Sequence, residues 1–135
     1  LGIAVCQYLQ TKIEEGCDKI SKKGGHPWIF AETRINTVKS GEICPISSLQ
    51  ADFDQFSAKL KKELKKTTDM EIEYFKKLVT EYAPGLSDYS QAVNSYLALK
   101  GALQYRRILG EEFYEKSVMS IKKEFYDFLD KKERN

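Results

Sequence analysis

Hydrophobic residues recur every three or four positions along most of this chain, which is the spacing of one face of an α-helix. The longest such pattern consists of Leu49, Phe53, Phe56, Leu60, Leu64, Thr68, Ile72, Phe75, Val79 and Tyr82. Ser48 is a residue type that favours a helix start, and Pro84 with Gly85 interrupts any helix that reaches them. We therefore expect a helix over residues 48–83, followed by a turn and a second helix that forms a hairpin with it.

Two positions leave the boundaries of these helices open. Thr68 and Glu71 form a capping-box pattern, so a kink or a break near Thr67 is an alternative to one continuous helix. After the turn, apolar positions at helical spacing continue from Tyr89 almost to the end of the chain. Gly110 lies in the middle of them, and it either ends one helix or bends a single long one over residues 87–133.

The first part of the chain predicts another amphipathic helix and a shorter one. The first carries Val5, Tyr8, Leu9, Ile13, Cys17 and Ile20 on one face and ends at the sequence KKGG. Behind Pro27, a favourable residue in a first helical turn, the apolar residues Trp28, Ala31, Ile35 and Val38 follow at helical spacing. We expect a short helix from Pro27 to Ser40, with Gly41 as its C-cap.

These elements predict an all-α protein. We expect an antiparallel bundle of four main helices, with a long crossover that carries the short helix between the first helix and the central hairpin. The chain has 135 residues, which is the usual size of one domain, so residues 1–135 are interpreted as a single helical-bundle domain.

The composition of the chain argues against two classes of protein, nucleic-acid binders and membrane-spanning proteins. Hydrophobic residues make up 41% of the chain and charged residues 31%, which is typical of a folded, soluble protein. The net charge is only +2, so the chain lacks the strong general field of most nucleic-acid binders. No recognisable motif for sequence-specific nucleic-acid binding is present, and no run approaches the roughly 20 apolar residues of a membrane-spanning helix.

Motifs of enzymes and of cofactor sites are also missing from the sequence. It contains no phosphate-binding loop, no GxGxxG, no GxSxG, no HExxH and no CxxC. Di-iron bundles need two Glu-x-x-His pairs, which one His cannot supply. We therefore expect a protein that is not an enzyme, with no cofactor and no metal.

The stretch from Gly24 to Pro45 nevertheless concentrates unusual residues, including the only His and the only Trp of the chain. Trp28, Ile29 and Phe30 provide the apolar bulk either to plug the bundle or to form a binding surface, and the plug is the favoured interpretation. His26 lies alone at a Gly-Gly to Pro junction, where capping or hydrogen bonding is favoured over chemistry.

Cys6, Cys17 and Cys44 are an odd number of cysteines in a chain that does not need disulfides. Cys6 and Cys17 lie three helical turns apart, so they cannot pair within one helix. A disulfide would therefore join Cys44 to Cys17 or to Cys6. Three buried reduced thiols are the favoured alternative.

Lysines crowd two helical turns at Lys59, Lys61, Lys62, Lys65 and Lys66, with Glu63 as the only acid among them. A solvated helix face is the favoured interpretation of such a run. The alternative is a docking strip for an anionic membrane surface, nucleic acid or an acidic partner, because clustered lysines raise the local potential.

The resulting hypothesis is a non-enzymatic binding module that acts through protein-protein contacts, either with a partner or with a second copy of itself. Its binding surface would be Trp28, Ile29 and Phe30 together with the lysine run. The alternatives are a carrier of a lipid or other apolar ligand within the aromatic-rich bundle, and docking to an anionic membrane. The sequence does not indicate a cellular location.

Overall fold

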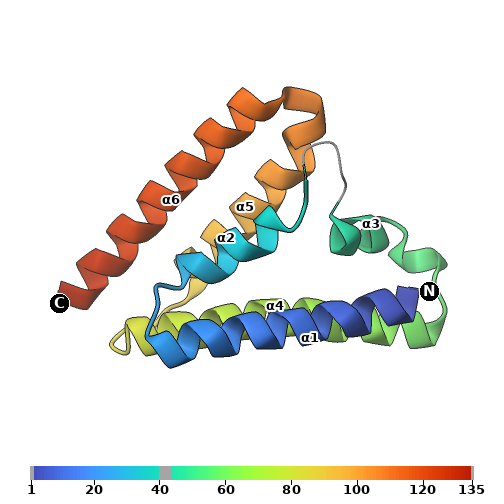
Figure 1. Cartoon of the computed structure of the whole chain (residues 1–135), viewed down its shortest axis with the longest axis horizontal. Helices are drawn as coiled ribbons and strands as arrows, with labels where there is room; N and C mark the ends of the chain where they lie inside the picture. The colour runs from blue at the N-terminus through green and yellow to red at the C-terminus, as the bar shows by residue number, and fades with distance from the viewer. Residues whose placement is uncertain (1, 40–43, 135) are drawn as a thin grey trace.

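A computed structural model of the chain describes residues 2–39 and 44–134. This part of the chain is helical and contains no strand, which confirms the all-α prediction. Its helices are α1 (Gly2–Lys23), α2 (Trp28–Asn36), α3 (Pro45–Ala51), α4 (Ala58–Tyr82), α5 (Ser90–Leu109) and α6 (Glu111–Arg134), with a 3₁₀ turn η1 (Phe53–Gln55) before α4. The four long helices are α1, α4, α5 and α6, and α2 and α3 lie on the crossover between α1 and α4 (Figure 1).

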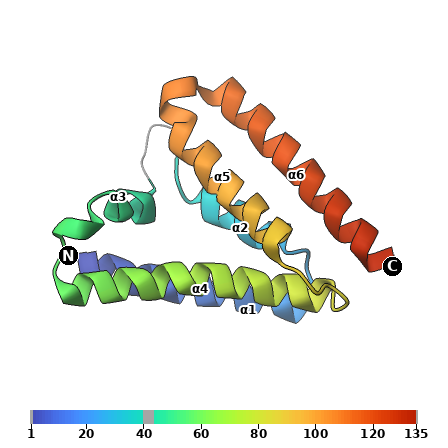
Figure 2. The same cartoon turned by 180° about the vertical axis from the view of Figure 1, so that it is seen from behind.

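The long helices pack mainly in two pairs, α1 with α4 and α5 with α6 (Figures 1 and 2). The α1–α4 pair is parallel: Gln10 Nε2 donates to Thr67 Oγ1 at 3.0 Å, and Ser21 Oγ donates to Glu81 Oε2 at 2.8 Å, so residue numbers rise together along both helices. The antiparallel prediction was wrong for this pair, because the crossover returns the chain to the end where α1 begins. Helices α5 and α6, which a single residue connects, are antiparallel as predicted (Figure 1).

The predicted helix over residues 48–83 is two helices in the structure. The chain leaves helical geometry after α3, and α4 begins with Ser57 as N-cap, whose Oγ accepts a hydrogen bond from the Leu60 N–H at 3.2 Å. The break near Thr67 does not occur, since α4 is continuous from Ala58 to Tyr82. The Thr67 and Thr68 hydroxyls donate to the carbonyls of Glu63 and Leu64 at 2.9 Å instead of capping a new helix.

The predicted ends of the first helix and of the long helix before Pro84 are confirmed. Helix α1 ends at Lys23 before Gly24, whose φ of 62° is the left-handed conformation that glycine adopts readily. Helix α4 ends at Tyr82, ahead of Pro84. Gly110 has a φ of 91° and separates α5 from α6, so this part of the chain is a helical hairpin and not one bent helix. Helix α2 ends at Asn36, earlier than Ser40, and the predicted C-cap at Gly41 lies outside the described residues.

Aromatic rings from four helices form the centre of the core. The ring of Phe75 on α4 lies 5.0 Å from Tyr96 on α5, 5.6 Å from Phe125 on α6 and 6.3 Å from Phe30 on α2, measured between centroids. Helix α2 therefore lies where the two helix pairs meet, and it holds them together. On its other side it faces α1, which is where the candidate site lies.

Candidate functional site

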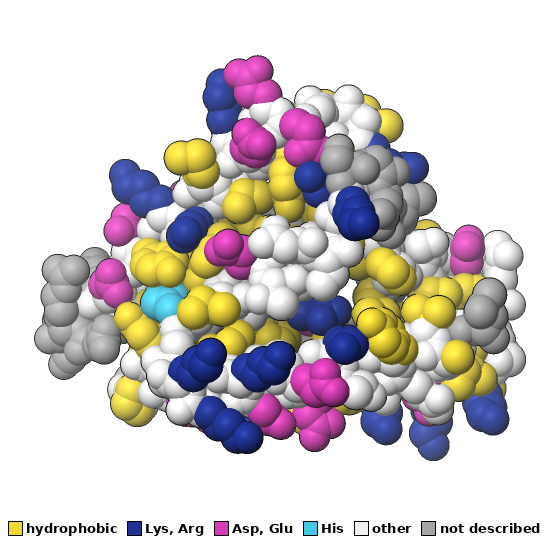
Figure 3. All heavy atoms as spheres, viewed as in Figure 1, with side chains coloured by type: hydrophobic (Ala, Val, Ile, Leu, Met, Phe, Trp, Pro, Cys, Tyr) yellow, Lys and Arg dark blue, Asp and Glu magenta, His cyan; other side chains and the backbone are white. Residues whose placement is uncertain are grey.

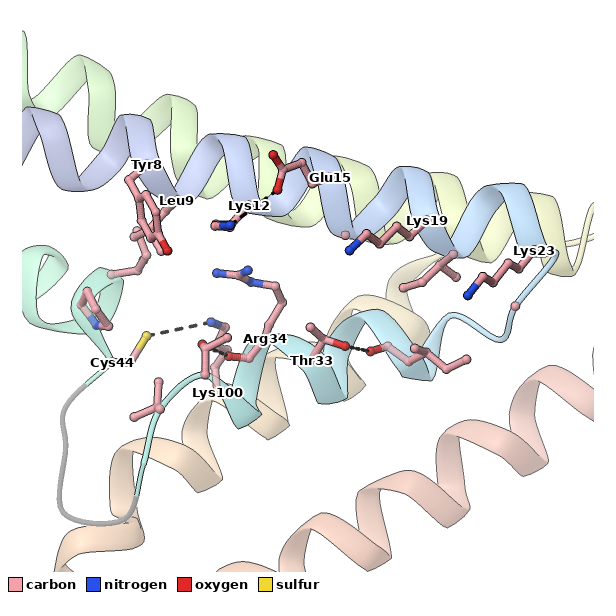
Figure 4. Close-up of a pocket in the computed structure, with 18 residues that line it drawn as sticks. Tyr8, Leu9, Lys12, Glu15, Lys19, Lys23, Thr33, Arg34, Cys44 and Lys100 are labelled. Atoms are coloured by element: carbon pink, nitrogen blue, oxygen red, sulfur yellow. Dashed lines mark hydrogen bonds and ion pairs between the residues drawn. The ribbon is translucent and has the colours of Figure 1, made fainter.

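A groove with a volume of about 720 Å³ lies between α1 and α2, and α3 and α5 close one end of it (Figure 4). We call it the α1–α2 groove. Its lining residues are Tyr8, Leu9, Lys12, Glu15, Gly16, Lys19, Ile20, Lys23, Gly25, Ile29, Thr33, Arg34, Thr37, Val38, Cys44, Pro45, Ile46 and Lys100. They come from four helices and two connections, so the groove exists only in the folded chain.

The floor of the groove is apolar. Ile20, Val38, Cys44 and Ile46 are buried, whereas Ile29 faces the groove with 47% of its surface exposed. Helix α1 contributes one face only, since Lys12, Gly16, Lys19 and Lys23 follow at steps of four, three and four. A side-chain carbon placed at Gly16 would meet no atom within 4 Å, so this glycine leaves open space in the middle of the wall.

The rim of the groove is positively charged. Lys12, Lys19 and Lys23 project from α1, Arg34 from α2 and Lys100 from α5 (Figure 4). Among the described residues that line it, Glu15 is the only acid. On the same face in the space-filling view, Lys and Arg side chains lie close to hydrophobic ones (Figure 3). An apolar floor beside several cations is complementary to a molecule with an apolar body and a negative group.

Two of these cations already have carboxylate partners. Lys12 Nζ lies 3.6 Å from Glu15 Oε2, in a pair that is about half exposed. Lys100 Nζ lies 2.6 Å from Glu71 Oε1, and the Glu71 side chain is only 5% exposed. Glu71 also accepts a hydrogen bond from the Tyr96 hydroxyl. Burial and the nearby Glu71 charge raise the pKa of Tyr96 well above its usual value, so that hydroxyl stays a donor.

Arg34 differs from both lysines. Within the described part of the chain no carboxylate forms an ion pair with it, and its Nε atom is buried without a hydrogen-bond partner. Its guanidinium points from α2 into the gap toward α1 (Figure 4). A buried donor without an acceptor is unfavourable by about 1–3 kcal/mol, and the guanidinium charge has no described carboxylate to balance it.

The residues that the sequence indicated as a crossover surface are only partly at the surface. Trp28 and Phe30 are 2% and 1% exposed, so they belong to the core and do not form a docking surface. Ile29, between them, points the other way and lines the groove. His26 Nδ1 accepts a hydrogen bond from the Trp28 N–H at 3.0 Å, which is the capping role that the sequence favoured.

The five lysines of the predicted strip do not form a single row on α4. At 100° per residue, Lys59, Lys62 and Lys66 share one side of the helix, and Lys61 and Lys65 lie on another. Lys65 Nζ pairs with Asp69 Oδ2 at 2.6 Å. A second, shallower hollow on this face is lined by three of the lysines and also by three acids, which are Glu63, Asp69 and Glu73. Whether these lysines dock an anionic surface stays a prediction.

Cys6, Cys17 and Cys44 are free and buried, so the structure contains neither the Cys17–Cys44 nor the Cys6–Cys44 disulfide. Cys17 Sγ donates to the Tyr74 carbonyl at 3.8 Å, and burial raises the pKa of its thiol. Cys44 Sγ lies 4.0 Å from Lys100 Nζ at the end of the groove. No group of three or more metal-ligating side chains converges among the described residues.

Sequence reasoning did not find the groove. Three of its cations and Gly16 do share one face of α1, and that spacing was the available signal. The opposite wall could not be located from the sequence, because Arg34 and Ile29 reach the groove only through the position of α2.

No helix in the described part of the chain has the length and apolarity that crossing a membrane requires. No family model, no curated protein and no solved structure matches this chain, so its function must be inferred from the groove itself.

Proposed function

We propose that this protein is a non-enzymatic binding module that carries a small anionic amphiphile, a lipid with a negatively charged head, in the α1–α2 groove. The observation that supports this most is the apolar floor beside a cationic rim. The groove volume of about 720 Å³ lies within the range of about 300–1,000 Å³ that small-molecule sites occupy.

The chemistry of the lining residues favours binding over catalysis. The charged side chains there are four lysines, one arginine and one glutamate, and two of the lysines pair with carboxylates. The single histidine of the chain, the commonest acid-base catalyst, caps α2 and stacks on Tyr126 with 3.9 Å between ring centroids. The groove therefore offers electrostatic attraction and apolar contact.

A titration with laurate, a simple anionic amphiphile, tests the proposal, with Gly16→Leu as a blocking variant. The added Cβ meets no atom within 4 Å, and the substitution replaces a mid-helix glycine, which favours the helix by roughly 0.5–1 kcal/mol. We expect wild-type protein to bind laurate, and the variant to be at least as stable but to bind weakly or not at all. Wild-type protein that binds no laurate at low salt would contradict the proposal.

Self-association is a second candidate function, supported by exposed apolar residues around the α5–α6 turn. Tyr105, Ile108, Leu109 and Phe113 are 60%, 80%, 48% and 50% exposed, and clustered exposed apolar residues commonly mark interaction sites. Light scattering across a range of protein concentrations tests this candidate. Ile108→Lys should shift a dimer to monomer without affecting laurate binding, and a wild-type protein that stays monomeric at high concentration would exclude it.

A further inference from the structure

We infer that Arg34 is the head-group anchor of the α1–α2 groove, and that the ligand is a single-chain lipid with a carboxylate or phosphate head. This inference rests on the proposed function and makes it specific. It assigns the negative group to one side chain and the hydrocarbon chain to the apolar floor.

Among the cations of the groove, Arg34 offers a bound anion the most favourable interaction. Its buried Nε has no acceptor, and within the described residues no carboxylate neutralises its charge. A guanidinium also presents its N–H groups in a planar fork that matches a carboxylate or phosphate. A ligand oxygen in the groove would therefore form a charge-assisted hydrogen bond with a guanidinium that no described carboxylate neutralises.

The remaining cations are less suited to be the anchor. Lys12 and Lys100 have carboxylate partners at 3.6 Å and 2.6 Å. Lys19 and Lys23 are exposed at the rim, where water and salt weaken a direct pair. Their contribution is to raise the positive potential around the entrance, which favours anionic ligands over neutral ones and speeds their arrival.

The apolar surface next to Arg34 suits one hydrocarbon chain. On α2, the half-exposed Ile29 lies nearer the N-terminus than Arg34 and lines the groove. On the opposite wall, α1 contributes the open space at Gly16 and the side chain of Ile20. This wall spans Gly16 to Ile20 and on to Lys23, about 10 Å along α1 at 1.5 Å per residue. The space lies between two helices, and a chain that lies along it places its head at Arg34.

A matched pair of ligands separates the head from the chain. Laurate and dodecanol have equally long chains, but only laurate is charged. We expect Arg34→Gln to weaken laurate binding by about tenfold or more, the usual effect of losing a hydrogen bond to a charged group, and to leave the weaker dodecanol binding unchanged. Arg34→Lys should restore much of the laurate affinity. Lys62→Gln, on α4 and outside the groove, should change neither.

A second series identifies the source of the anion. Acetate and inorganic phosphate alone should bind far more weakly than laurate or dodecyl phosphate, because they lack the chain. From decanoate to laurate, each methylene buried in the groove should tighten binding by about fourfold, which corresponds to about 0.8 kcal/mol. A free anion that binds as tightly as laurate would mean that the groove recognises the anion without a lipid, and would overturn this inference.

The possible failures are distinguishable. If Arg34→Gln binds laurate as tightly as wild type does, or loses dodecanol equally, Arg34 is not the head-group anchor, but the proposed function stands. If wild-type protein binds neither ligand, the proposed function fails. Isothermal titration calorimetry gives each affinity, and circular dichroism on the same samples verifies that each variant is folded.

Discussion

At the scale of single residues, Trp28 shows how the crossover stabilises the fold. Its side chain is 2% exposed, its Nε1 donates to Glu32 Oε2 at 2.9 Å, and its ring lies 5.9 Å from that of Phe125 on α6. The neighbouring Ile29 points into the groove. Of these two adjacent residues, Trp28 thus belongs to the core and Ile29 to the wall of the groove.

Trp28→Ala should lower the free energy of unfolding by about 3 kcal/mol, because it removes a buried aromatic ring and leaves a cavity. Ile29→Ala is the matched control, and it should change stability by less than about 1 kcal/mol because Ile29 is 47% exposed. Urea unfolding curves of both variants measure the difference. Equal stability for wild type and Trp28→Ala would contradict the role of Trp28 as a plug.

His26 makes stability depend on pH. Burial lowers its pKa from 6.5 to about 4. The charge of Asp130 raises this pKa by a smaller amount, and that of Lys122 lowers it further. In the unfolded chain the imidazole takes up a proton first as the pH falls, so stability should be complete above pH 6.5 and decrease between pH 6.5 and about 4. We expect this one group to account for about 1–3 kcal/mol of the decrease.

Carboxylates also titrate toward pH 4, so the measurement needs a variant that isolates His26. In His26→Asn the amide oxygen can still accept the hydrogen bond from the Trp28 N–H, but the side chain does not titrate. The urea-unfolding profile of the variant should be flatter between pH 6.5 and 4. A profile parallel to that of wild type would rule out the protonation of His26 as a cause.

At the scale of helices, the sequence predicted faces better than ends. The spacing of Leu49, Phe53, Phe56 and Leu60 continues through the junction of α3, η1 and α4. Leu49, Phe56 and Leu60 pack against the core, whereas Phe53 in η1 is exposed. Periodicity alone could not show that the chain leaves the helix there. Gly24 was recognisable as a helix end and Gly110 as one of two alternatives, because a positive φ favours glycine.

Ser57→Ala should therefore destabilise the protein by about 1 kcal/mol, since Ser57 Oγ accepts a hydrogen bond from the first turn of α4. Ser48, which the sequence indicated as the cap, lies inside α3 and is exposed. Ser48→Ala should be neutral or slightly stabilising, because alanine favours a helix interior. Thermal unfolding of the two variants compares the sites, and the reverse ranking would place the start of the long helix at Ser48.

At the scale of the whole molecule, positive charge occurs in two settings. Three lysines of α4 line a hollow together with three acids, whereas the groove rim has Glu15 as its one acid among the described lining residues. The run in α4 was conspicuous in the sequence because its lysines are adjacent there. The groove cations are spread over three helices, and only the fold gathers them.

Replacing Lys61, Lys62, Lys65 and Lys66 by Gln should leave helicity and melting temperature nearly unchanged, because exposed charges contribute little to folding. Laurate binding should also persist, since none of the four lines the groove. If the lysines dock to membranes, association with anionic vesicles should fall and should weaken with salt, which screens exposed charges over about 8–10 Å at physiological strength. Vesicle co-sedimentation that is equal for variant and wild type would show that the α4 lysines are a solvated face.

The parallel α1–α4 pair also affects the order of folding. Its hydrogen bonds join residues 53 to 61 positions apart, whereas α5 and α6 meet across a single glycine. Closing a long loop costs more chain entropy than forming a local hairpin. In a pulsed hydrogen-exchange experiment during refolding, the amides of α5 and α6 should therefore become protected before those of α1. Since α1 forms one wall of the groove, the chain would acquire its binding site only in the last stage of folding.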